Sequence, residues 1–81
     1  MTARVYVSMK PTVLDPQGQT IRASLNSHGH TSITAVRQGK YFEINLADGT
    51  DKAQAAAELD QISREVLSNP VIEEYRVEIL D

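Results

Sequence analysis

The chain of 81 residues contains no cysteine and no tryptophan, and its only aromatic side chains are one Phe and three Tyr. Without cysteine it can form no disulfide, no thiolate metal site and no cysteine nucleophile. It also has few large side chains to fill an interior, and a domain of this size is near the lower limit for a self-sufficient core. We therefore expect burial to be completed in a homo-oligomer.

Long apolar runs are also missing from the sequence. No stretch approaches the ~20 consecutive apolar residues that span a bilayer. The first residues lack the charged and apolar regions of a secretory signal. Together with the absence of cysteine, these features predict a soluble cytoplasmic protein that has no membrane partner.

The net charge of −3 conceals an uneven distribution of charged residues. Residues 1–40 contain five Lys or Arg and a single acid, Asp15, whereas residues 41–81 contain three Lys or Arg and ten acids. A nucleic-acid-binding domain usually has a dominant basic face. The distribution therefore argues against nucleic-acid binding and favours a protein partner that recognises opposite charges on two faces.

The N-terminal half of the sequence predicts one strand and one helix. Apolar and polar residues alternate over residues 3–10, which is typical of a strand with one apolar face. Pro11 ends this strand, because proline cannot donate a ladder hydrogen bond. Asp15 followed by Pro16 then predicts the start of a helix over residues 16–28, with the carboxylate as N-cap.

The C-terminal half predicts a strand, a helix and a final strand. Residues 33–46 alternate like a long strand, but the apolar positions change phase near Gly39, which predicts a bend there. Asp51 resembles the N-cap of a helix over residues 52–68, whose apolar stripe is expected to face the core. Residues 71–80 alternate again and predict the last strand.

The element order strand, helix, long bent strand, helix, strand predicts an α+β fold. We expect a two-layer sandwich, in which a small, mostly antiparallel sheet carries both helices on one face. Residues 1–81 are expected to form a single domain. The other sheet face would remain uncovered, which is a second reason to expect oligomerisation.

Residues with catalytic or metal-binding potential are scarce. The sequence contains no Gly-rich phosphate loop and no Ser/His/Asp arrangement. His28 and His30 flank Gly29 and could share a metal, but no third ligand lies nearby, and a helix C-terminus favours His in any case. We therefore predict no catalytic residue, no metal site and no enzymatic activity of the isolated chain.

A basic end of the sheet is the candidate functional surface. If the first two strands pair antiparallel, Lys10, Arg37 and Lys40 gather at one end with little local acid to neutralise them. The neighbouring loop contains Val13 and Leu14, which are apolar residues within a turn. Our hypothesis is that these five residues dock on partner subunits. The alternative is an ordinary solvated surface.

Three segments, in their order and spacing, resemble the PurS family, the small subunit of phosphoribosylformylglycinamidine (FGAM) synthase. They are Lys10-Pro11-x-Val13-Leu14-Asp15-Pro16-x-Gly18, Arg37-x-Gly39-Lys40-Tyr41 and Asn69-Pro70-Val71-Ile72-Glu73-x-Tyr75-x-Val77-Glu78. The resemblance extends from Val5 to Glu78. One departure is His28-Gly29-His30, where the family usually has Leu-Gly followed by an aromatic residue.

The resemblance implies a non-catalytic subunit in de novo purine biosynthesis. In that family a glutaminase subunit releases ammonia, and a large ATP-dependent synthetase subunit uses it to form the amidine. The PurS-type subunit forms a dimer or tetramer, bridges the other two subunits and supports ammonia transfer. ATP, Mg and glutamine are used by the complex, and the resemblance implies no cofactor on this chain.

Other classes of protein share the expected element pattern. A small-ligand-binding regulatory domain of the ferredoxin-like type remains an alternative, with its pocket at a dimer interface. An acylphosphatase needs a Gly-containing anion loop beside the first strand, and Lys10-Pro11 does not provide one. An RNA-recognition fold needs exposed aromatic residues and a basic face, which this composition disfavours.

Overall fold

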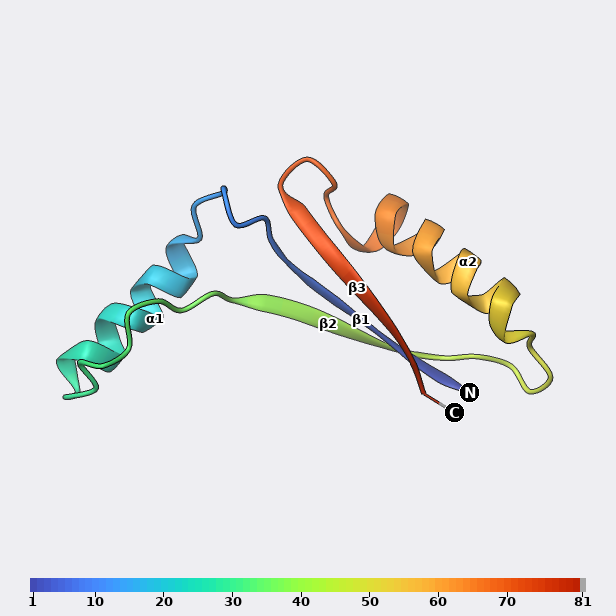
Figure 1. Ribbon diagram of the computed structural model, residues 1–81, viewed down its shortest axis with the longest axis horizontal. Coiled ribbons are helices and arrows are strands. Elements are labelled where there is room, and N and C mark those ends of the chain that lie inside the picture. Colours follow the sequence, from blue (N-terminus) through green and yellow to red (C-terminus); the bar gives the residue numbers. More distant parts are fainter. Residues whose placement is uncertain (81) are drawn as a thin grey trace.

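The computed structural model describes residues 1–80 and shows three antiparallel strands and two helices (Figure 1). In chain order the elements are β1 (Thr2–Met9), α1 (Pro16–Ser27), β2 (Gly39–Asn45), α2 (Lys52–Ile62), the π-helical turn η1 (Ser63–Leu67) and β3 (Glu73–Leu80). The predicted α+β class and antiparallel sheet are confirmed. Neither helix in the described part of the chain has the length and apolar character needed to cross a membrane.

The first strand, β1, is the centre of the sheet, whose order is β2-β1-β3. Val5 pairs with Phe42 on one side and Val77 on the other. Paired residues share a face, so the alternation read from the sequence produces one apolar face around Val5. The opposite face is polar, and on it Arg4 lies between Glu43 and Glu78.

The core lies between the apolar face of the sheet and α2. Five apolar side chains are fully buried among the described residues, and they come from β1 and α2: Ala3, Val5, Val7, Ala55 and Leu59. α2 packs along β3, on the far side of β1 from β2. Phe42 and Ile44 of β2 share the apolar face but remain only half-buried.

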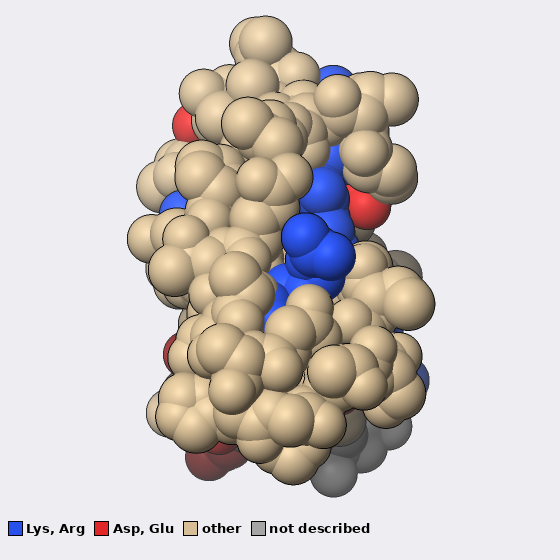
Figure 2. Space-filling model, turned by 90° about the vertical axis from the view of Figure 1, so that its left-hand side faces the viewer, with Lys and Arg blue, Asp and Glu red and all other residues tan. Residues whose placement is uncertain are grey.

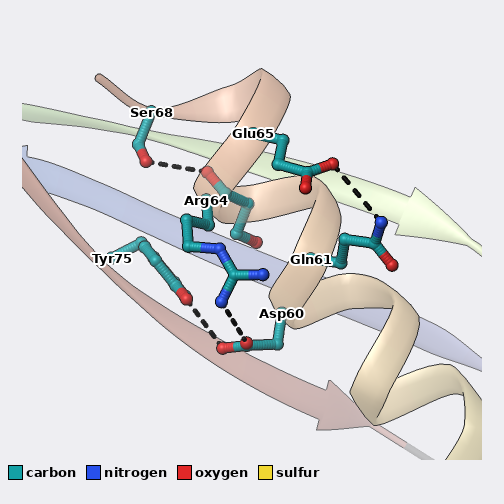
Figure 3. A network of polar contacts seen from close by, with 7 residues as sticks. Asp60, Gln61, Arg64, Glu65, Ser68 and Tyr75 are labelled. Carbon is teal, nitrogen blue, oxygen red and sulfur yellow. Dashed lines mark hydrogen bonds and ion pairs between the residues drawn. The ribbon is translucent and has the colours of Figure 1, made fainter. Parts of the chain in front are cut away.

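A polar network fixes α2 to β3 (Figure 3). The Tyr75 hydroxyl donates to the Asp60 carboxylate at 2.7 Å, and Arg64 lies 3.7 Å from the other oxygen of Asp60. This hydrogen bond, together with partial burial and the Asp60 charge, raises the pKa of Tyr75. The predicted helix over residues 52–68 ends in a wider π-helical turn, because Ser68 donates its N–H and its hydroxyl to the carbonyl of Ser63, five positions earlier, which closes η1.

The first helix does not lie where the two-layer arrangement places it. Only α2 covers the apolar face, whereas α1 extends beyond the end of the sheet, on the left in Figure 1. The described chain measures 50 × 26 × 14 Å and has a radius of gyration of 16.2 Å, against about 12 Å for a compact chain of this length. The prediction that both helices lie on one face of the same sheet is therefore wrong for the single chain.

The predicted long strand over residues 33–46 is also shorter than expected. β2 begins at Gly39, and residues 33–38 run beside α1 without a strand partner, held in part by Asn26, whose side-chain amide donates to the Ile33 carbonyl. The physical reason lies at Gln38, whose N–H donates to the Asp15 carboxylate at 2.7 Å. The position where the bend was predicted is therefore the first residue of the strand.

Candidate functional site

The basic residues expected at one end of the sheet do lie together. β1 and β2 pair antiparallel, as the hypothesis required, with Val7 opposite Lys40. An Arg37 nitrogen, Nη2, lies 2.8 Å from the Lys10 carbonyl oxygen, so residues 27 positions apart in the chain are neighbours here. Figure 2 shows Lys and Arg side chains as a strip on the side of the molecule where α1 lies.

Arg37 is bound to the loop that follows β1. Its guanidinium donates to the carbonyl oxygens of Met9 at 3.2 Å, Lys10 at 2.8 Å and Val13 at 3.2 Å. The planar fork of an arginine suits several acceptors at once. Arg37 was predicted as a docking charge, and this structural role was not predictable from the sequence, because the carbonyls that Arg37 binds are 24 or more positions away.

Asp15 joins the start of α1 to the segment before β2. One carboxylate oxygen accepts the N–H of Gly18 at 2.9 Å, and the other accepts the N–H of Gln38 at 2.7 Å. The residue is only 6% exposed. The bond from Gln38, then that from Gly18, and the nearby charge of Arg37 hold the pKa of Asp15 below its ordinary value, against the opposing effect of burial.

Gly18 allows this junction to close. A Cβ atom at position 18 would clash with the Val36 carbonyl oxygen and crowd the Asp15 carboxylate. The first turn of α1 can therefore approach the segment before β2 only because residue 18 has no side chain.

The expectation of little acid at this end is wrong. Glu73 and Lys40 line one cleft of about 160 Å³, and Glu74 lies with Arg37 along another of about 290 Å³. Both acids begin β3, which pairs with the end of β1. Lys40 also lies over the Phe42 ring, with Nζ 5.7 Å from the ring centre. The basic residues therefore form part of a mixed surface.

Apolar side chains are exposed on two joined loops at the same end. Leu14 is 63% exposed, and Val71, in the turn before β3, is 77% exposed. The two loops are linked by the Lys10 N–H, which donates to the Ile72 carbonyl at 2.9 Å. We call residues 10–14 and 69–72, together with Arg37 and Lys40 beside them, the loop end. Leu14 was predicted as part of the docking surface and Val71 was not, although an apolar residue directly after Pro70 in a turn indicates an exposed apolar position.

A second apolar surface lies on α1. Ile21 is 40% exposed, and a shallow depression of about 360 Å³ is lined mainly by this helix, including Pro16, Thr20 and Ile21. No extensive contact joins α1 to a strand or to α2 within residues 1–80. The apolar face of this helix is therefore left without a layer to cover it.

His28 caps the C-terminal end of α1, and His30 follows two residues later. His28 is exposed, and its Nδ1 atom lies 2.7 Å from the Ser24 carbonyl oxygen, as is common at a helix C-terminus. Over residues 1–80, no three His, Cys, Asp or Glu side chains are grouped in a way that could hold a metal ion.

Comparison with known sequences assigns the chain to a family. Residues 2–81 match the family model described as PurS: Phosphoribosylformylglycinamidine (FGAM) synthase. The chain belongs to the PurS family. A Mycobacterium leprae protein described as phosphoribosylformylglycinamidine synthase subunit PurS is 43% identical over 75 residues, which cover 93% of this chain and 90% of that protein. A Synechocystis protein of the same description is 41% identical over 76 residues, covering 94% of this chain and 75% of that protein.

Solved PurS structures share the fold. The Bacillus subtilis PurS structure superposes with a TM-score of 0.83 at 34% identity, covering 99% of this chain and 98% of that chain. A structure described as PurLQS from Thermotoga maritima gives a TM-score of 0.86 at 29% identity, covering 98% and 95%. The resemblance drawn from the three segments is thus confirmed. In this PurS chain, those segments hold the junctions at Asp15, Arg37 and the Asn69–Ile72 turn.

Proposed function

We propose that this chain is the non-catalytic PurS subunit of FGAM synthase, which bridges the glutaminase and the ATP-dependent synthetase subunits in the cytoplasm. The observation that carries the proposal is the match of residues 2–81 to the PurS family, together with the superposition on a chain described as part of PurLQS. ATP, Mg and glutamine then belong to the other subunits. The contribution of this chain is its surfaces, which hold those subunits in one complex.

The proposal includes self-association as a dimer or as a dimer of dimers. Two apolar surfaces in the single chain lack a cover: the side of α1 that contains Ile21, and the β2 part of the sheet face at Phe42 and Ile44. They cannot cover each other because α1 extends away from the sheet. In a two-fold pair, α1 of each copy can lie on the β2 side of the other copy's sheet. The apolar face of each sheet then carries two helices, its own α2 and the α1 of the partner.

The loop end is the surface that we propose docks on the partner subunits. Leu14 supplies exposed apolar area, Val13 beside it in the loop is half-buried, and Lys10 and Lys40 steer the approach of an acidic partner. Arg37 belongs to this surface through its hold on the loop carbonyls. Its contribution is therefore the shape of the loop more than its charge.

A reconstituted complex tests the proposed function. Glutamine-dependent amidination is measured with the glutaminase and synthetase subunits, with and without this chain. We expect the reaction to require the chain, whereas ammonia supplied directly should support amidination by the synthetase subunit without it. Equal glutamine-dependent rates with and without the chain would refute the bridging role.

Charge reversal at the loop end tests the docking surface. The double variant Lys10→Glu with Lys40→Glu should assemble more weakly than the native chain, most visibly at low salt, because steering by exposed charges is screened by salt. Arg76→Glu, on the polar face of the sheet, is the control reversal away from this surface. A folded double variant with unchanged coupling would show that the loop end is an ordinary solvated surface.

A further inference from the structure

The orientation of α1 depends on very few interactions. Within residues 1–80, no extensive contact joins this helix to the sheet or to α2. It is connected to the sheet through the loop after β1 at its start, and through residues 28–38 on the return to β2. Both connections pass through one junction at the end of the sheet, where the Asp15 and Arg37 side chains lie.

The hydrogen bonds of Asp15 and Arg37 cross this junction in complementary ways. The Asp15 carboxylate binds the N–H of Gly18 in the helix and the N–H of Gln38 before β2. The Arg37 guanidinium binds the carbonyls of the loop after β1. The outgoing and returning chains are thus linked by a carboxylate on one and a guanidinium on the other. We call Asp15 and Arg37 the clasp.

We propose that the clasp is a positioning device, which holds α1 at one angle to the sheet and so presents the helix preformed to a second copy of this chain. Neither side chain belongs to the buried core formed by β1 and α2. Loss of the clasp should therefore loosen the helix relative to the sheet and leave the core between the sheet and α2 in place. This inference rests on the self-association proposed above.

The expected effect on assembly follows from population arithmetic. If α1 adopts the docking angle for a fraction f of the time, the apparent Kd of one docking event rises as 1/f. A reciprocal pair uses two helices, so the Kd rises as 1/f². A helix that keeps the docking angle for about one third of the time weakens the pair by about tenfold.

Two substitutions release the clasp with little other change. Asp15→Asn keeps a side-chain oxygen to cap Gly18, but the remaining amide group is a donor and cannot accept the Gln38 N–H. Arg37→Lys keeps the charge and loses the planar fork that reaches several carbonyls. The matched controls are Asp51→Asn and Arg22→Lys. Asp51→Asn alters the N-cap of α2, where the carboxylate accepts the Gln54 N–H, and Arg22→Lys makes the same change of cation on α1.

The angle is measured by single-molecule energy transfer between two dyes. Because the chain has no cysteine, Ser27→Cys near the end of α1 and Asp48→Cys before α2 provide two unique labelling sites. These sites lie toward opposite ends of a chain 50 Å long (Figure 1). At picomolar concentration the measurement reports on the unpaired chain, so it does not depend on whether self-association occurs. Sedimentation then gives the Kd of the unlabelled protein.

We expect a narrow distribution of energy-transfer efficiency for the native chain and for both controls. Asp15→Asn and Arg37→Lys should broaden or shift this distribution and leave the midpoint of thermal unfolding unchanged. Both should raise the Kd of self-association about tenfold. An unchanged distribution in both variants, or a broadened one with an unchanged Kd, would overturn the inference. If either variant fails to fold, Gly18→Ala replaces it, since the added methyl group displaces α1 from Val36 without removing a polar group. A native chain that stays monomeric would instead refute the proposed self-association.

Discussion

Replacement of Ile21 by Ser gives the most direct test of the uncovered face of α1. Fully burying an isoleucine side chain contributes about 1.5–3 kcal/mol. Ile21 is 40% exposed in the single chain, so its remaining area contributes about 0.6–1.2 kcal/mol when a second copy covers it. A two-fold pair contains this contact twice, which gives about 1.2–2.4 kcal/mol. We therefore expect Ile21→Ser to raise the Kd of self-association about 8- to 60-fold.

Sedimentation velocity over a dilution series measures this Kd. Ala23→Ser is the matched control, because residue 23 is exposed and lies on the opposite side of the same helix. Far-UV circular dichroism confirms that both variants keep their helices. A Kd for Ile21→Ser within twofold of the native value, with helicity intact, would show that the second copy does not cover α1, and the reciprocal arrangement would have to be abandoned.

Three further predictions concern the fold and its ionisable groups. Leu59→Ala, which empties a fully buried position, should reduce the free energy of unfolding by about 2–5 kcal/mol in denaturant titrations; a loss below about 1 kcal/mol, half the lower bound of that range, would contradict the core assignment. The pKa of Asp15 is lowered in the folded chain, so its bonds stabilise the junction above the ordinary carboxyl pKa, and this stabilisation is lost as the pH falls through the lowered value. The energy-transfer distribution should therefore broaden in acid for the native chain and show no such acid step for Asp15→Asn. Because a hydrogen bond to Asp60 is the main cause of the raised Tyr75 pKa, Asp60→Asn should lower that pKa toward its ordinary value in an ultraviolet titration; an unchanged titration would assign the shift to burial.

The parts of the fold that depend on local chemistry were predictable from the sequence. Asp15 and Asp51 are the N-caps of the two helices, as their positions indicated, and each accepts the N–H of the residue three positions later. The alternation in the last strand places Tyr75 and Val77 on the apolar face, as expected. These features follow from interactions within a few residues, which a single sequence contains in full.

The placement of α1 was not predictable in the same way. An apolar helix face satisfies the same sequence pattern whether its own sheet or another chain covers it. The start of β2 depends on Asp15, which takes the Gln38 N–H from 23 positions away. The role of Arg37 likewise depends on loop carbonyls that no local pattern identifies. Each of these failures concerns a contact between segments distant in the sequence, and all three lie at the junction of α1 with the sheet.

The central position of β1 has a consequence for folding during synthesis. This strand is made first, but both of its neighbours come later, and β3 is the last of the described elements to be made. Val5 and Val7, which are buried in the finished sheet, therefore stay without their full cover until β3 has been translated. Contacts of such long sequence separation form slowly, because a large loop must close before they stabilise the chain. Nascent chains should accordingly be a substrate for holding chaperones until the final strand joins β1.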